Sequence, residues 1–320
     1  MSFGEKIKNW MDRWVGTPQI TVLTEDLSDT HASLMEFQWN APSEDIKSSR
    51  KTIRMQDVFL LDQKAKVQTP KDTVALYLPE REVIMVRSPI NGGIDRLIPF
   101  RNTQGMTPLC GRFGPKGEES VALYDPKAGY FRIWESIEDS EPHYQFLFGP
   151  PKCGWIPLAG DWDGDGRDGI GLYCPQTSTF LLKNDLEGGE PDRTFMFGAP
   201  QSQWKPLVGD WNGDGRSGVG LLNAGEGVFY LRNTLEGGEH EIQIQLSIKG
   251  PDLIPISGDW NGWGRDSVGV FDPREFSFYL ETVDAASDWM QFKYGISDDV
   301  GVPLRMQVTS GTPREAAPAR

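Results

Sequence analysis

The sequence predicts an all-β protein built as a closed β-propeller, and two recurring features lead to that fold class. A short apolar run recurs as Val74 to Tyr77, Val121 to Tyr124, Ile170 to Tyr173, Val219 to Leu222 and Val268 to Phe271. A proline that opens another run recurs at Pro108, Pro157, Pro206, Pro255 and Pro303. A period of about 50 residues that contains several short strands is typical of propeller blades and not of helical solenoids.

One repeat unit contains four strand-like runs. In the unit that begins at Pro157 they read PLAGDW, GIGLYC, TFLLKN and RTFMFG. Apolar side chains occupy both faces of the third run, as expected for sheets that stack on a neighbour at each side. The connection LEGGE, at Leu186 and again at Leu235, supplies a glycine pair that suits a tight return. The sequence therefore predicts four antiparallel strands in each blade.

Counting the units gives the predicted number of blades. Five complete units begin near Val58, Pro108, Pro157, Pro206 and Pro255. Pro303 opens a sixth unit that ends after one strand, and the strand-like runs between Gln19 and Arg54 are otherwise unassigned. Joining these runs to the C-terminal strand predicts six blades, in preference to five or seven, with both chain termini in one blade. Such closure removes the exposed edges that an open stack would leave.

The first 16 residues have helical spacing, and Gly16 followed by Pro18 would end the helix. The apolar face of this short amphipathic helix would contain Phe3, Ile7, Trp10, Met11 and Trp14. That face could pack on the same chain, or it could bind a membrane surface or a larger assembly as the partner-binding element. We therefore expect three segments: the helix over 1–16, the propeller over 17–308 and a disordered Pro/Ala-rich tail over 309–320.

Composition argues against several classes of function. The net charge of -14 argues against a nucleic-acid partner, since phosphate contacts need clustered Lys and Arg. Cys110, Cys153 and Cys174 lack the spacing of a disulfide framework or a zinc site. The sequence has no apolar run of about 18 residues that would form a transmembrane segment, and it does not begin with an export signal of the usual pattern. We expect a cytoplasmic protein, either free or peripheral on a membrane.

The densest group of oxygen ligands lies in WIPLAGDWDGDGRDGIGLYCP, from Trp155 to Pro175. Carboxylates at alternate positions, followed by a glycine that permits a sharp turn, can converge on a calcium ion. The same residues could instead form a metal-free turn in which the aspartates accept local backbone N–H groups. Closely spaced carboxylates repel one another without a cation, which favours calcium. The candidate ligands are Asp161, Asp163, Asp165, the carbonyl oxygen of Arg167, and Asp168.

Two weaker copies of this loop follow. The candidate ligands of the second copy are Asp210, Asn212, Asp214 and the carbonyl oxygen of Arg216. Its lower charge predicts weaker binding. The third copy keeps Asp259 and Asn261 but has Trp263 in place of a carboxylate, so we expect it to be empty or poorly occupied. The sequence therefore predicts one or two Ca²⁺ ions, in the loops over 161–168 and 210–217.

The unit before these loops has cations in place of acids. Arg112 stands at the first ligand position and Lys116 at the third. We expect the Lys116 ammonium group to take the place of the ion, neutralised by Glu118 or Glu119, in a loop of similar shape.

The motif GDWDGDGR followed by GIGLY, with FLFGPP at Phe146 to Pro151 and FMFGAP at Phe195 to Pro200, resembles the FG-GAP repeats of integrin-alpha-type β-propellers and their VCBS-type bacterial relatives. The resemblance extends over about Pro108 to Gly295 through these motifs, and over Val58 to Thr107 by strand pattern alone. It implies that the acidic loops join the first two strands of a blade and hold calcium on one face of the ring. It also implies that partners bind the other face or the rim.

The resemblance supports a subset of the candidate ligands: Asp161, Asp163, Asp165, Asp210, Asn212, Asp214, Asp259 and Asn261. The chain departs from the family where Gly169, Gly218 and Ser267 replace a further Asp of many family loops. The family is also mostly extracellular, whereas this chain begins with no recognisable export signal.

The tryptophans divide into two groups. Trp162, Trp211 and Trp260 recur within the loops, and Trp155 and Trp204 recur before the prolines, which predicts that all five pack between blades. Trp134 and Trp263 break the pattern and are candidates for a surface contact.

Three functions fit the sequence. We favour a non-catalytic, calcium-stabilised protein-interaction or scaffold subunit that binds another protein or a larger assembly, including one on the cytoplasmic side of a membrane. The alternative is a carbohydrate-binding propeller, which predicts that the recurring tryptophans are exposed. The third is a hydrolase with a site at the ring centre, although the sequence contains no recognisable nucleophile motif, zinc-protease motif or phosphate-binding loop.

Overall fold

The structure is a computed structural model that describes residues 71–88, 93–100, 103, 105–150, 154–281, 289–296 and 299–307, and the backbone of 34–37 and 51–54. The chain separates into two compact units, Met1–Gln68 and Thr69–Arg320. In the first unit, β1 (Leu34–Phe37) pairs antiparallel with β2 (Lys51–Arg54).

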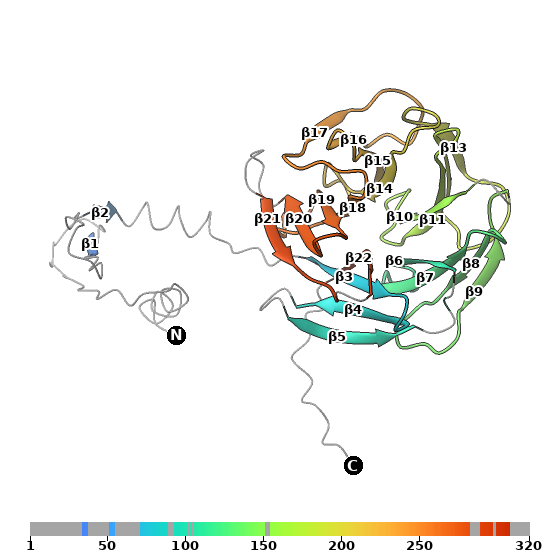
Figure 1. Cartoon of the computed structure of the whole chain (residues 1–320), viewed down its shortest axis with the longest axis horizontal. Helices are drawn as coiled ribbons and strands as arrows, with labels where there is room; N and C mark the ends of the chain where they lie inside the picture. The colour runs from blue at the N-terminus through green and yellow to red at the C-terminus, as the bar shows by residue number, and fades with distance from the viewer. Residues whose placement is uncertain are drawn as a thin grey trace, which may run out of the picture. The chain divides into compact units, whose positions relative to one another are not determined.

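The second unit is a five-bladed β-propeller made of four-stranded antiparallel sheets (Figure 1). Blade 1 consists of β22 (Val302–Gln307), β3 (Asp72–Leu78), β4 (Val83–Arg87) and β5 (Ile94–Pro99). Blade 2 consists of β6 (Thr107–Gly111), β7 (Ser120–Asp125), β8 (Tyr130–Ile133) and β9 (Tyr144–Leu147). Blade 3 consists of β10 (Ile156–Gly160), β11 (Gly169–Cys174), β12 (Thr179–Lys183) and β13 (Arg193–Met196). Blade 4 consists of β14 (Lys205–Gly209), β15 (Gly218–Asn223), β16 (Val228–Arg232) and β17 (Ile242–Gln245). Blade 5 consists of β18 (Ile254–Gly258), β19 (Ser267–Asp272), β20 (Ser277–Glu281) and β21 (Trp289–Lys293).

The five blades form a closed ring. Their first strands contact one another in the order β22, β6, β10, β14 and β18, and β18 contacts β22 again (Figure 1). The ring closes within blade 1, where β22 from the C-terminal end of the propeller pairs with β3 from its N-terminal end. Both ends of the propeller therefore lie in one blade, and the first strands leave no open gap in the ring.

The predicted number of six blades is wrong. Val74 lies in the second strand of its blade, as Val121 and Ile170 do in theirs, and the first strand of that blade is the one opened by Pro303. The first and last units of the sequence are thus two parts of blade 1, which the prediction counted twice. Among the described strands, β1 and β2 pair only with each other and add no blade.

Several predictions fall outside the residues that the structure describes. The described residues contain no helix, and so none that is long and apolar enough to cross a membrane. The predicted boundaries at 17 and 309 lie beyond the described ranges. The predicted helix over 1–16 also lies there, together with its apolar residues Phe3, Ile7, Trp10, Met11 and Trp14.

Five hydrophobic cores hold the ring together, one at each interface between neighbouring blades. In the core between blades 3 and 4, Trp162 and Phe180 of blade 3 lie with Val219 of blade 4. Trp162, Trp211 and Trp260 are each only 3% exposed and Trp155 is also buried, while Trp204 is partly buried against the core between blades 3 and 4, so the recurring tryptophans pack between blades as predicted. Close-packed interfaces of this kind hold the strands in place, and with them the ends of the described loops that join β10 to β11, β14 to β15 and β18 to β19.

Candidate metal centre and the loop face

The acidic loops lie at one edge of the ring. In a four-stranded antiparallel blade, the connection between strands one and two and that between strands three and four lie at the same edge. We call this edge the loop face. Loop 3 (161–168) joins β10 to β11, loop 4 (210–217) joins β14 to β15, and loop 5 (259–266) joins β18 to β19.

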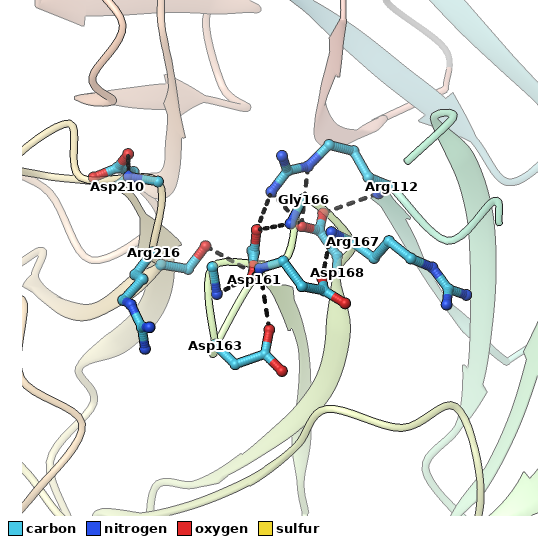
Figure 2. Close-up of polar contacts among 12 residues, drawn as sticks. Arg112, Asp161, Asp163, Gly166, Arg167, Asp168, Asp210 and Arg216 are labelled. Carbon is cyan, nitrogen blue, oxygen red and sulfur yellow. Dashed lines mark hydrogen bonds and ion pairs between the residues drawn. The ribbon is translucent and has the colours of Figure 1, made fainter. Parts of the chain in front are cut away.

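In loop 3, Asp161 organises the turn. Its side chain is buried and directly follows β10. Asp161 Oδ1 accepts the N–H of Gly164 at 2.6 Å and of Asp165 at 3.2 Å, and Oδ2 accepts the N–H of Gly166 at 2.9 Å (Figure 2). Gly166 has a φ of 91°, a conformation that favours glycine. Burial raises the pKa of Asp161, and the N–H groups of Gly166 and Gly164 oppose that effect.

Three carboxylates converge in loop 3. One oxygen each from Asp161, Asp163 and Asp165 lies within 4.8 Å of the others. Asp163 Oδ1 accepts the N–H of Asp165, and Asp165 Oδ1 accepts the N–H of Arg167, so both side chains are held near the turn. Among the described residues, no protein donor contacts the Oδ2 atoms of Asp163 and Asp165. This set of hard oxygen donors fits the ligand preference of Ca²⁺.

Asp168 has a different partner. Arg112 of blade 2 donates its backbone N–H to Asp168 Oδ2 at 2.9 Å and its Nη2 to Asp168 Oδ1 at 2.9 Å (Figure 2). Arg112 Nη2 also lies 3.3 Å from Asp161 Oδ2. Both oxygens of Asp168 are therefore engaged in a bridge between blades 2 and 3. The candidate ligands of loop 3 narrow to three carboxylates and the carbonyl oxygen of Arg167.

Loop 4 repeats the turn with fewer available oxygens. Asp210 accepts the N–H groups of Gly213, Asp214 and Gly215 at 2.7, 3.1 and 2.8 Å. The Nδ2 of Asn212 donates to Asp214 Oδ2 at 2.9 Å, and this bond is the main reason that the pKa of Asp214 is lowered. The amide of Asn212 thus binds the oxygen whose equivalent on Asp165 of loop 3 has no such donor. Loop 4 is the weaker candidate for a cation.

Loop 5 shows what the turn itself requires. Asp259 accepts the N–H of Trp263 at 2.8 Å and of Gly264 at 2.7 Å, and Asn261 Oδ1 accepts the N–H of Trp263 at 3.1 Å. These bonds match those of loop 3 although Trp263 replaces a carboxylate. The Nζ of Lys71 lies 3.7 Å from Asp259 Oδ2 and supplies a positive charge beside it. The first aspartate and the glycines therefore set the shape of the loop without a full set of ligands.

The corresponding connection in blade 2 differs from the prediction. Lys116 is exposed, and its backbone N–H, not its ammonium group, donates to Glu118 Oε2 at 2.8 Å. Glu119 accepts the N–H of Gln307 in blade 1. The side chain of Arg112 contacts Asp161 and Asp168 in blade 3. No pairing of the Lys116 ammonium with Glu118 or Glu119 is present in the described structure.

Three grooves open between neighbouring blades. The groove between blades 1 and 2 has a volume of about 490 Å³ and includes Trp134 in its lining. The groove between blades 2 and 3 has a volume of about 400 Å³ and is lined by Tyr144, the acidic residues of loop 3 and the connection 184–187. The groove between blades 4 and 5 has a volume of about 160 Å³ and is lined by Trp263, Arg265 and Glu281, among others. Trp263 is 41% exposed, in contrast to the buried recurring tryptophans.

A second set of equivalent residues, which the sequence reasoning missed, ties the blades together. The residue two positions before each apolar second-strand run accepts a backbone N–H from the end of the first strand in the preceding blade. The sequence contains a signal for this set, because the five residues recur at the same spacing as the apolar runs. The signal is weakened because four of them are acidic and the fifth is a serine. We call the five residues the capping ring. Its bonds are Gln307 N to Glu119 (2.8 Å), Arg112 N to Asp168 (2.9 Å), Asp161 N to Ser217 (3.0 Å), Asp210 N to Asp266 (2.8 Å) and Asp259 N to Asp72 (2.8 Å).

No family model and no curated protein matches the sequence. Among solved structures, the chain is similar to BBS1N in complex with ARL6DN, with 10% identity and a TM-score of 0.36 over 74% of this chain and 76% of that one. It is also similar to a protein provisionally named 6-phosphogluconolactonase from Bacteroides fragilis, with 14% identity and a TM-score of 0.37 over 86% and 80%. A third is the biofilm matrix protein Bap1 of V. cholerae, with 13% identity and a TM-score of 0.30 over 85% and 44%. Likeness at this level carries no argument about activity or partner.

Proposed function

We propose that this chain is a non-catalytic propeller of the FG-GAP type that binds one Ca²⁺ ion in loop 3 and acts as an interaction or scaffold subunit for another protein. The observation that carries the proposal is the convergence of Asp161, Asp163 and Asp165 on a loop that the closed ring holds in place. A bound calcium ion would neutralise carboxylates that otherwise repel one another. The protein would supply a preformed turn for it.

The Phe-Gly motifs support the FG-GAP assignment. Phe148 and Phe197 are 2% and 4% exposed, and Gly149 and Gly198 follow them with φ values of 82° and 97°. A Cβ added to Gly198 would overlap the Cδ1 of Leu221. The phenylalanine therefore fills a core between blades while the glycine lets the chain turn tightly against the second strand. This is a physical reason for the motif to recur with the repeat.

The number of ions follows from the three loops. Loop 4 has an amide in place of one carboxylate, and that amide binds an oxygen of Asp214. Loop 5 has Trp263 in place of another carboxylate and Lys71 beside its first aspartate. Both contain less unneutralised negative charge than loop 3, which favours a single ion there.

The grooves favour the loop face as the binding surface. The groove between blades 2 and 3 is lined by Asp185 and Glu187, which are outside the proposed calcium site, and the whole chain has a net charge of -14. A partner with a basic surface would match this charge, and electrostatic attraction would speed its association. The FG-GAP resemblance instead implies that partners bind the other face or the rim. The experiment below therefore also tests which face binds the partner.

The capping ring supports a non-catalytic function. An enzyme with a site at the ring centre would need an acid and a base there that are available to a substrate. The carboxylates of Asp72, Glu119, Asp168 and Asp266 each accept a backbone N–H from the neighbouring blade. These contacts give the four carboxylates a role in holding the blades together.

Affinity capture with charge reversals at the two edges of the ring tests the proposed function. The loop-face bait carries Asp185→Lys and Glu187→Lys, and the control bait carries Glu226→Lys in the turn between β15 and β16, at the opposite edge. We expect the unchanged protein to capture a reproducible set of partners, the loop-face bait to lose it and the control bait to keep it. Loss of the partners with the control bait alone would place the binding surface on the opposite face of the ring. No reproducible partner on any bait would contradict the interaction function.

A carbohydrate-binding propeller is the second candidate, and the groove between blades 4 and 5 favours it. Trp263 offers an exposed ring, with Arg265 and Glu281 in the same groove as hydrogen-bonding groups. This alternative predicted that the recurring tryptophans are exposed, and they are buried or partly buried, so the test uses the exposed Trp263 of this groove instead. A glycan array on which the protein binds, and on which Trp263→Ala loses binding, would support it. An array without binding would contradict it.

A further inference from the structure

One position recurs in the first strand of every blade, and in blade 1 it has a charge. It is defined by its backbone pairing with the first residue of the apolar run in the second strand. In blades 2 to 5 this position contains a small or uncharged residue: Cys110, Ala159, Val208 and Ser257. In blade 1 it contains Arg305, which pairs with Val74 and lies in the C-terminal strand β22.

The guanidinium of Arg305 reaches carboxylates from three blades. Its Nη1 lies 3.9 Å from Asp72 Oδ2 in blade 1 and 3.6 Å from Asp266 Oδ2 in blade 5. Its Nη2 lies 3.9 Å from Asp168 Oδ2 in blade 3. The side chain of Arg305 is 26% exposed, whereas those of Asp72, Asp168 and Asp266 are 6%, 2% and 11% exposed. One side chain therefore connects blades that are not neighbours in the ring.

The capping ring needs this charge. Four of its five members are acidic, and carboxylates held close together in a buried setting raise one another's energy when ionised. Burial raises the pKa of Glu119 to about 7, and Arg305 opposes that effect. Burial alone would lower the pKa of Arg305, but the surrounding carboxylates raise it instead. Arg112 neutralises part of the charge at Asp168.

We propose that Arg305 is the counter-ion of the capping ring and acts as an ionic latch that holds the C-terminal strand in blade 1. Among the described strands, β22 pairs with β3 alone, so one of its edges is hydrogen-bonded to a neighbouring strand. Arg305 adds contacts to blades 3 and 5, and Gln307 adds the bond to Glu119 in blade 2. The C-terminal strand of the propeller thus brings the positive charge that the other blades require, and closure of the ring depends on that charge.

Hydrogen exchange of the full chain tests the latch. Arg305→Met removes the charge and keeps much of the apolar stem, Arg305→Lys keeps a charge, and Arg193→Met removes an exposed arginine as a control. We expect Arg305→Met to speed exchange in β22 and β3 by about tenfold relative to β11 and β15, because breaking a partly buried ion pair leaves carboxylates uncompensated. Arg305→Lys should have a smaller effect, and Arg193→Met none.

A second set of variants separates charge from packing. Glu119→Gln and Asp266→Asn are made in the unchanged protein and in Arg305→Met. We expect the pair to slow exchange of β22 by a larger factor in the Arg305→Met background than in the unchanged background, where Arg305 already offsets part of the charge. Equal effects in both backgrounds, or unchanged exchange in Arg305→Met, would overturn the latch. If Arg305→Met does not fold but the triple variant does, the result would support the proposal. If neither variant folds, the shape of the Arg305 side chain, and not its charge, would be what the ring requires, and the proposal would be overturned.

Discussion

Asp259 donates its backbone N–H to Asp72 Oδ2 at 2.8 Å, and 187 residues separate the two in the sequence. This bond joins blade 5 to blade 1 and completes the capping ring. The Gln307–Glu119 bond between blades 1 and 2 likewise spans 188 residues, whereas the three other bonds of the capping ring, such as that of Asp161 to Ser217, span 56. The type of hydrogen bond that joins the other neighbouring blades therefore also closes the ring where the two ends of the propeller meet. The side chains that accept these bonds recur at the repeat spacing of the sequence.

The Phe-Gly motif can be tested with two glycine substitutions. Gly198→Ala should lower the free energy of unfolding by about 2 to 4 kcal/mol, because the new Cβ overlaps Leu221 and φ is 97°. Gly166→Ala should cost about 1 kcal/mol, because φ is 91° but no atom lies near its Cβ. Denaturant unfolding in the presence of a chelator measures both. Equal costs would contradict the packing account of the motif.

The recurring tryptophans should differ in energy despite equal burial. Trp162 Nε1 donates to the carbonyl oxygen of Ile170 at 3.0 Å, whereas the Nε1 of Trp260 has no hydrogen-bond partner in the described structure. Trp162→Phe should therefore destabilise the protein by about 1 kcal/mol more than Trp260→Phe. Thermal and denaturant unfolding of the two variants provide the comparison, and the reverse order would show that packing outweighs the hydrogen bond.

Glu119 should make stability depend on pH. Its ordinary pKa is 4.5, and burial raises it to about 7 in the folded protein. The folded state then binds the proton more tightly than the unfolded state, so this contribution to stability is present at low pH and falls as pH rises from about 4.5 to about 7. The loss should be about 2 to 3 kcal/mol.

Glu119→Gln should remove that slope and leave the rest of the profile. Denaturant unfolding between pH 4.5 and 8 measures it, with Glu118→Gln, which replaces the exposed neighbour, as the control. A profile that keeps its slope in Glu119→Gln would show that another group is responsible.

Two aspartates of loop 3 should behave differently without any metal. Asp161 accepts three backbone N–H groups and contacts Arg112, so Asp161→Asn leaves Gly166 without its acceptor and should cost about 1 to 3 kcal/mol in the presence of a chelator. Asp163 is exposed and accepts one N–H, which an asparagine oxygen can accept as well, so Asp163→Asn should change stability by less than about 0.5 kcal/mol. Similar costs for both would contradict the role of Asp161 as organiser of the turn.

The local structure of a blade could be predicted from the sequence. The four runs identified after Pro157 coincide with β10 to β13, because alternating apolar residues and glycine-rich turns determine strands at short range. Burial of the tryptophans followed from their repeat spacing. The acidic loops were also placed correctly between the first and second strands of their blades.

Long-range pairing could not be predicted in the same way. The pairing of Arg305 with Val74 joins residues at opposite ends of the propeller, and no local pattern distinguishes a lone final strand from the start of a new blade. The same limit applies to Asp168, which looks like a metal ligand next to Asp161 but has its partner, Arg112, in another blade. Arg112 itself occupied a ligand position in the repeat, and its real contact became visible only with the ring assembled.

Calcium titration calorimetry tests the central claim of the account most directly. The unchanged protein is compared with Asp163→Asn/Asp165→Asn, which keeps the acceptors of the turn, and with Asp214→Asn in loop 4 as the matched control. We predict one bound Ca²⁺ per chain for the unchanged protein and for Asp214→Asn, and no binding for the double variant. Absence of binding by the unchanged protein, or the same binding by the double variant, would contradict a calcium site in loop 3.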